Sequence, residues 1–110
     1  TDLGAALQGG LGVAASANLH PGRTSMFEPV HGSAPKYAGA GTANPLAAIL
    51  TAVLLLENLG HTAAAAAVEA AVGRTIRAGE VTRDLGGELS TSEVGERLAR
   101  ALLEAEVAAP

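Results

Sequence analysis

The sequence predicts an α/β chain that is mostly helical, with two or so short strands near its N-terminal end. Ala and Leu dominate the second half, and both residues favour helices. Apolar runs there are bracketed by helix start and stop signals. The early stretch Thr24–Val30 instead has the β-branched and aromatic content of a short strand. A length of 110 residues allows one domain at most, with a core of modest size.

The first forty residues predict little regular structure. Gly9 and Gly10 close an apolar segment as a helix C-terminus would. Pro29 is tolerated only towards the end of a strand or at a sheet edge. In chain order we expect the end of a helix over residues 2–8, an extended segment over Leu11–Leu19, a turn at His20–Arg23, a strand over Thr24–Val30 and an irregular loop over His31–Thr42.

The clearest helix follows that loop. Asn44 can cap a helix, and Pro45 suits its first position, where a missing N–H costs nothing. The helix then runs to Gly60, a residue typical of the position after a helix end. Its sequence is apolar nearly all round, so we expect it to be buried on several sides.

Two further helices are predicted. Thr62 can cap the second, which ends near Gly79, and a loop over 80–89 follows. The last helix begins with a capping box, in which Ser90 precedes Glu93 by three residues. Its apolar stripe recurs at helical spacing and comprises Val94, Leu98, Ala101, Leu102 and Ala105.

Composition excludes several classes of function. The net charge of −4 argues against a nucleic-acid partner, which would require clustered Lys and Arg. The absence of Cys excludes disulfides and thiolate metal sites. The longest uncharged run, Tyr37–Leu56, is broken by Gly, Asn and Pro, so its apolar part is too short to cross a membrane. Cytoplasm is the default location. Because the chain starts "TDLGAALQGG" without an initiator Met, we expect it to be a piece of a larger protein.

One stretch, "MFEPVHGSAPKYAG" at residues 26–39, concentrates the unusual side chains. The only Met, Phe, Lys and Tyr of the protein all lie between Met26 and Tyr37. Gly39–Asn44 follows, a near match to the G-x-G-x-x-G phosphate loop ahead of a helix. It lacks the third Gly and a clear preceding strand, so taken alone it is better explained as an ordinary loop.

The candidate site residues each have a plain structural explanation beside the functional one. A lone His such as His31 is more often structural than functional. An isolated Asp2 in a helix tail is usually just solvated, and a loop Lys is usually a surface charge. Lys36 beside Tyr37 is nevertheless a plausible anion pocket. Arg83 could complete it only if the fold brings the two loops together.

The run "FEPVHGSAP", followed by "AGAGTANP" and an apolar helix, resembles the cofactor loop of the β-decarboxylating dehydrogenases. These are the 3-isopropylmalate, isocitrate, homoisocitrate and tartrate dehydrogenases. The resemblance extends from "TDLGAALQGGLGVAASANL" through "TRDLGG" to the last helix. It implies a two-domain α/β subunit without Rossmann topology, working as a homodimer on a small-molecule substrate. Residues 1–19 would end the central domain and form the crossing segment, and residues 20–110 would complete the cofactor-binding domain.

The resemblance also assigns residues. Asp2 matches a carboxylate that holds Mg²⁺ or Mn²⁺, for which hard oxygen ligands are suited. No catalytic residue is assigned, because the acid–base Tyr and Lys of the family would lie upstream. The implied cofactor contacts are Glu28 near the nicotinamide ribose, His31 at the adenosine, Gly32, Ser33 and Ala34 around the pyrophosphate, Lys36 and Tyr37 at the adenosine ribose, Asn44 at the adenine, and Arg83 and Asp84 in the later loop.

Lys36 decides between the two dinucleotides. NAD-using members of the family typically carry Asp there, whereas NADP-using isocitrate dehydrogenases carry Lys-Tyr, as here. A Lys–phosphate hydrogen bond is of order 1.5–3 kcal/mol, roughly tenfold to a hundredfold in affinity. Glu28, Pro29, Val30 and Ser33 look instead like the NAD-using members. The cofactor is therefore NAD(P), and Lys36 favours NADP.

The resemblance implies metal-dependent oxidative decarboxylation of a malate-type 2-hydroxy acid. The flanking segments favour 3-isopropylmalate, and hence leucine biosynthesis, with isocitrate, homoisocitrate or tartrate as alternatives. A second alternative, from another class, is a non-catalytic helical interaction module, suggested by the missing catalytic set and the apolar helix. These 110 residues alone are expected to be inactive.

Overall fold

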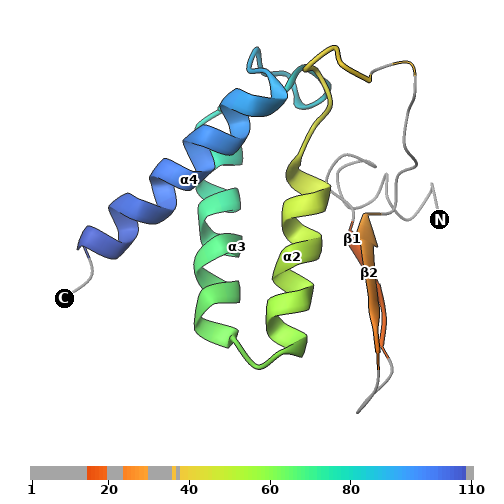
Figure 1. The fold of residues 1–110 in the computed structure, drawn as a ribbon. Coiled ribbons are helices and arrows are strands. Elements are labelled where there is room, and N and C mark those ends of the chain that lie inside the picture. Colours follow the sequence, from red (N-terminus) through yellow and green to blue (C-terminus); the bar gives the residue numbers. More distant parts are fainter. Residues whose placement is uncertain (1–14, 20–23, 30–35, 37, 109–110) are drawn as a thin grey trace.

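The computed structural model describes residues 15–19, 24–29, 36 and 38–108. The predicted helix end over 2–8 and the turn at His20–Arg23 lie outside these residues. Most of the chain described is helical, with one two-stranded sheet, which confirms the predicted class (Figure 1). The elements are β1 (Ala15–Asn18), β2 (Met26–Pro29), α2 (Leu46–Asn58), α3 (Thr62–Arg77), the 3-10 helix η3 (Arg83–Leu85) and α4 (Thr91–Ala108).

The two strands form an antiparallel ribbon beside α2 (Figure 1). Ala17 pairs with Phe27, and Ser16 pairs with Glu28. The Ser16 hydroxyl also donates a 2.7 Å hydrogen bond to the Glu28 carbonyl. Because side chains alternate along a strand, half-buried Phe27 faces α2 while exposed Glu28 faces away.

The start of α2 keeps the hydrogen bond expected of Asn44, but Pro45 occupies the capping position and the helix begins at Leu46, one residue later than predicted. The Asn44 side-chain oxygen accepts a 2.9 Å hydrogen bond from the Leu46 N–H. Pro45 has helical dihedral angles, and its carbonyl accepts the Ile49 N–H at 3.1 Å. Gly60 then ends the helix with φ of +86°, in the left-handed region that glycine tolerates best.

The start of α3 differs from the prediction. Thr62 is not the cap but the first helical residue, and His61 occupies the capping position without a side-chain hydrogen bond. The His61 N–H donates to the Leu56 carbonyl at 2.8 Å, while its own carbonyl accepts the Ala65 N–H. The tight turn thus uses His61 to close one helix and open the next, which leaves no spacer for a Thr62 cap.

The core lies where α2, α3, α4 and the segment after α3 meet. α2 packs against the ribbon on one side and α3 on the other, and α3 packs against α4. The central buried side chains are Leu46, Ala71, Val72, Val81, Val94 and Leu98. In the described part of the chain, no helix has the length and apolar character needed to cross a bilayer.

The apolar stripe of α4 is buried only at its N-terminal end. Val94 and Leu98 are buried, Ala101 and Leu102 are half-buried, and Ala105 is exposed. The physical reason is visible in Figure 1, where α4 diverges from α3 towards its C-terminal end.

Candidate functional site

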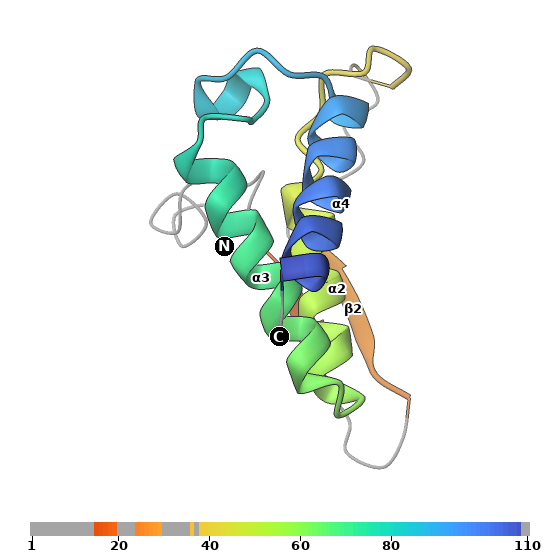
Figure 2. The same ribbon diagram turned by 90° about the vertical axis from the view of Figure 1, so that its left-hand side faces the viewer.

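Two loops far apart in the sequence meet at the N-terminal end of α2. They are residues 38–44, which precede α2, and residues 81–90, which lead into α4 (Figures 1 and 2). Thr91, the first residue of α4, joins them. Its N–H donates to the Gly41 carbonyl at 2.9 Å, and its hydroxyl donates to the Ala43 carbonyl at 2.5 Å. The fold thus brings the loop of Arg83 against the loop that follows Lys36, the condition the sequence left open.

A second connection runs through side chains. The Asn44 amide nitrogen donates to one carboxylate oxygen of Asp84 at 3.0 Å. The Thr82 hydroxyl donates to the other oxygen. Thr82 is only 1% exposed, whereas Asp84 is exposed. The buried Thr82 hydroxyl therefore holds the exposed Asp84 carboxylate in place, and that carboxylate in turn orients the Asn44 side chain at the start of α2.

Two glycines allow the sharp turn that presents Arg83 and Asp84. The Thr82 carbonyl accepts N–H groups from Leu85 at 3.1 Å and Gly87 at 3.0 Å. Gly86 has φ of +86°, in the left-handed region. A Cβ on Gly87 would lie 2.0 Å from the Val81 carbonyl oxygen, which is sterically impossible without movement. No larger residue fits this turn as it stands.

Between the loops lies a pocket of about 200 Å³. It contains both charge signs, because the exposed guanidinium of Arg83 shares it with the carboxylates of Glu88 and Glu93. A cationic fork of this kind is suited to binding phosphate oxygens in two-point fashion. The lining residues are Ala40, Gly41, Thr42, Arg83, Glu88, Leu89, Ser90 and Glu93.

The capping box predicted for α4 forms one wall of this pocket. The Glu93 carboxylate accepts the Ser90 N–H at 3.0 Å, and the Ser90 hydroxyl accepts the Glu93 N–H at 3.2 Å. The hydrogen bonds from Ser90 lower the pKa of Glu93 below its ordinary value, with a smaller contribution from the charge of Arg97. The guanidinium of Arg97 itself forms an ion pair with Glu80, at 2.6 Å.

The predicted site residues fall into three groups. Asn44, Arg83 and Asp84 are brought together. Glu28 is exposed on β2, and Lys36 is exposed just before the loop at 38–44. The remaining assigned residues, Asp2, His31, Gly32, Ser33, Ala34 and Tyr37, lie outside the described residues.

Sequence reasoning missed Thr82 and Thr91. Thr82 carried no local signal, because its hydroxyl donates to the side chain of Asp84 rather than to the backbone of a turn. Thr91 also carried no signal in the sequence. Its hydrogen-bond partners are the backbone carbonyls of Gly41 and Ala43, some fifty residues away.

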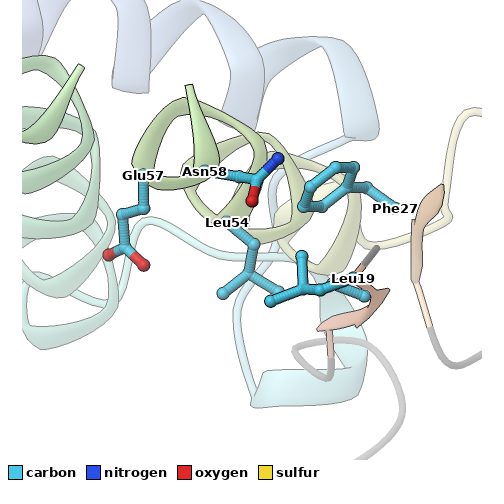
Figure 3. Close-up of a pocket in the computed structure, with 6 residues that line it drawn as sticks. Leu19, Phe27, Leu54, Glu57 and Asn58 are labelled. Carbon is cyan, nitrogen blue, oxygen red and sulfur yellow. The ribbon is translucent and has the colours of Figure 1, made fainter. Parts of the chain in front are cut away.

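A second, apolar pocket of about 270 Å³ lies between the ribbon and the C-terminal half of α2. Figure 3 shows Leu19 and Phe27 facing Leu54 and Asn58, with Glu57 pointing away from Phe27. Among these described residues Glu57 is the only titratable side chain. The other lining side chains are apolar or an amide, and Figure 3 shows Glu57 directed away from Phe27, so the arrangement is that of a packing surface.

Comparison with known proteins shows the family of the chain. The family model described as isocitrate/isopropylmalate dehydrogenase matches residues 1–98. The chain is 51% identical over 102 residues to 3-isopropylmalate dehydrogenase from Archaeoglobus fulgidus, covering 93% of this chain and 31% of that protein. It is 50% identical over 102 residues to isocitrate/homoisocitrate dehydrogenase from Thermus thermophilus, covering 93% and 30% respectively.

The fold agrees with the sequence match. The crystal structure of isocitrate dehydrogenase from Methylococcus capsulatus superposes with a TM-score of 0.86 at 40% identity, over 92% of this chain and 30% of that one. The chain thus spans less than a third of the length of these relatives. Sequence and fold together show that the chain belongs to the isocitrate/isopropylmalate dehydrogenase family.

Proposed function

We propose that this chain forms the adenosine-binding part of an NAD(P)-dependent dehydrogenase that oxidatively decarboxylates a malate-type 2-hydroxy acid. The observation that carries the proposal is the meeting of the two loops at the start of α2. It places Asn44 against Asp84 and puts Arg83 beside Ala40–Thr42. Of these residues, the family resemblance assigns Asn44, Arg83 and Asp84 to the cofactor. The relatives are named dehydrogenases, which supports the same class of reaction.

We further propose NADP as the preferred dinucleotide. Lys36 and Arg83 are both exposed cations, one just before and the other across from the loop at 38–44. Two such cations would bind a ribose 2′-phosphate by charge-assisted hydrogen bonds. The carboxylates of Glu88 and Glu93 oppose a phosphate near Arg83, so Lys36 is expected to contribute the larger share of the preference.

The proposed reaction also requires a metal ion and acid–base groups. Asp2, which lies outside the described residues, would supply one carboxylate to Mg²⁺ or Mn²⁺. When bound, such a cation would act as a Lewis acid on substrate oxygen atoms. The residues of this chain contribute binding and orientation of the dinucleotide. Acid–base groups would come from the rest of a two-domain subunit that works as a homodimer.

3-Isopropylmalate remains the favoured substrate, on the resemblance of the flanking segments. The sequence of this third of the subunit does not, however, separate relatives that act on different substrates. A probable tartrate dehydrogenase/decarboxylase from Agrobacterium vitis is 49% identical to the chain, close to the values for the isopropylmalate and isocitrate relatives. Isocitrate, homoisocitrate and tartrate are therefore retained as alternative substrates.

Calorimetric titration with 2′,5′-ADP and AMP tests the cofactor proposal. We expect the chain to bind 2′,5′-ADP more tightly, by about tenfold or more if Lys36 contacts the 2′-phosphate. Lys36→Asp should abolish that preference. Arg100→Ala, which removes an exposed cation on α4 away from the loops, is the matched control and should leave it intact. Equal affinity for both nucleotides, or an unchanged ratio in Lys36→Asp, would refute the NADP assignment.

Activity requires a complete subunit, which a chimera can supply. The first two thirds of the Archaeoglobus fulgidus relative would be joined to residues 1–110 of this chain. We expect turnover of 3-isopropylmalate that depends on Mg²⁺ or Mn²⁺ and is faster with NADP than with NAD. A folded chimera that is inactive with every malate-type acid would count against a catalytic role and favour the interaction-module alternative.

A further inference from the structure

The side chain of Asn44 is largely committed to the protein itself. Its oxygen accepts the Leu46 N–H, and its nitrogen donates to Asp84. A backbone N–H requires an acceptor and a carboxylate requires a donor, so only this orientation of the amide satisfies both neighbours. One N–H and one lone pair remain for any ligand. Asn44 is therefore a bridge between α2 and η3 as well as a candidate base contact.

The bridge depends in turn on Thr82. The Asp84 carboxylate is exposed, and an exposed Asp can ordinarily rotate. Here both oxygens accept hydrogen bonds, one from Asn44 and one from the Thr82 hydroxyl. Thr82 cannot itself move freely, because it is 1% exposed and its carbonyl accepts two N–H groups from the turn. The fixed end of the chain of hydrogen bonds is thus the buried threonine.

We propose that Thr82 is a positioning residue of the nucleotide site, whose buried hydroxyl orients the Asn44 amide through the carboxylate of Asp84. The inference rests on the proposed function, since it assumes that this end of α2 faces a nucleotide. It adds a role for a residue that contacts no ligand. It also assigns the Asn44 side chain a specific orientation that can be measured without any nucleotide.

Thr82→Val and Thr82→Ser separate the hydroxyl from the shape of the side chain. Val keeps the branched volume and removes the donor, while Ser keeps the donor and removes a methyl group. Thr75→Val is the matched control. Thr75 is also buried, and its hydroxyl donates to the Ala71 carbonyl within α3, away from the loops. Both Val variants therefore lose a buried threonine hydroxyl, but only Thr82→Val loses the hydrogen bond to Asp84.

The first measurement is the side-chain amide signal of Asn44 in a ¹H–¹⁵N spectrum of the 110-residue chain, without ligand. The proposal predicts that Thr82→Val moves this signal towards solvent-exposed values, as Asp84→Ala should. Thr82→Ser and Thr75→Val should retain its position. An unmoved Asn44 signal in Thr82→Val would overturn the positioning role, whatever the nucleotide data show.

The second measurement is the dissociation constant of 2′,5′-ADP for the same variants. Thr82→Val loses a hydrogen bond to a carboxylate that orients Asn44, so its affinity for 2′,5′-ADP should be weaker by about threefold to tenfold. The affinities of Thr82→Ser and Thr75→Val should lie within about twofold of that of the unsubstituted chain. Unchanged affinity in Thr82→Val despite a moved Asn44 signal would overturn the inference. If the unsubstituted chain bound no nucleotide, the proposed function would fail, and the Asn44 signal would still decide whether Thr82 orients the amide.

Discussion

Gly87 shows how one residue type determines the shape of the candidate site. Its missing side chain allows the turn to pass directly over the Val81 carbonyl, which then accepts the Leu89 N–H at 3.1 Å. The same turn presents Arg83 and Asp84 to the loop before α2. At the scale of single residues, the shape of the site therefore depends on the missing Cβ of Gly87 as well as on the charged side chains.

Gly87→Ala is expected to destabilise the chain by about 2–4 kcal/mol, because its Cβ would overlap backbone rather than a movable side chain. Gly95→Ala is the control. Gly95 lies within α4 with nothing within 4 Å of an added Cβ, so that variant should be neutral or more stable by about 0.4–1 kcal/mol. Urea unfolding measures both, and equal midpoints would contradict the turn geometry.

Glu93 gives the N-terminal end of α4 a predictable pH dependence. Its folded pKa is lowered by hydrogen bonds with Ser90, so the stability it contributes is present above its unfolded pKa and is lost as the pH falls through the folded value. Glu93→Gln keeps a capping side chain that does not titrate. The melting temperature of the unsubstituted chain relative to Glu93→Gln should therefore fall as the pH drops below the ordinary Glu value of 4.5 and through the lower folded value. A constant difference across that range would show that the carboxylate makes no pH-linked contribution.

At the scale of elements, the helices were more predictable than their surroundings. Asn44, Pro45 and Gly60 specify the limits of α2 locally, and Ser90 with Glu93 specify the start of α4. Such signals depend on neighbours in sequence, so one sequence suffices to find them.

Long-range pairings were not predictable in this way. Nothing in the sequence indicates that Ala17 pairs with Phe27, or that Thr91 bonds to Ala43, because both depend on the folded arrangement. The Thr62 cap failed for a related reason, since the turn at His61 serves both adjoining helices. For the candidate site, the resemblance selected Asn44 and Asp84, but their contact with each other required the structure.

Leu46 tests how strongly α2 is anchored. It is fully buried at the first turn of the helix, within the central cluster. Leu46→Ala should cost about 2–5 kcal/mol from lost burial and the cavity left behind. Leu59→Ala, at an exposed position after the same helix, should change stability by less than about 0.5 kcal/mol. Comparable losses in the two variants, measured by denaturant unfolding, would contradict the observed burial.

At the scale of the whole molecule, several large apolar side chains of the described residues are exposed. Leu19 and Met26 on the ribbon side are 61% and 50% exposed, and Leu55 and Leu59 of the α2 region are 40% and 61% exposed. In a family whose subunits are about three times longer, the remainder of a subunit is expected to cover such a surface.

The 110 residues alone are therefore expected to self-associate and to be catalytically inactive. Light scattering after size-exclusion chromatography should show species larger than a monomer, and Leu55→Lys combined with Leu59→Lys should reduce them. Ile76→Lys is the control, because Ile76 is exposed to a similar degree, 42%, on α3. A strictly monomeric unsubstituted chain would contradict the expectation.

Nucleotide titration followed by NMR tests most directly whether the two loops at the start of α2 form an adenosine site. The chain, or its Leu55→Lys/Leu59→Lys variant if association broadens the spectrum, would be titrated with 2′,5′-ADP to saturation. We predict that the largest shift changes fall on Gly39–Asn44 and on Arg83–Gly87, with α3 and the ribbon largely unaffected. Saturable shifts confined to the apolar pocket at Phe27 and Leu54, or none at either loop, would contradict the proposed site.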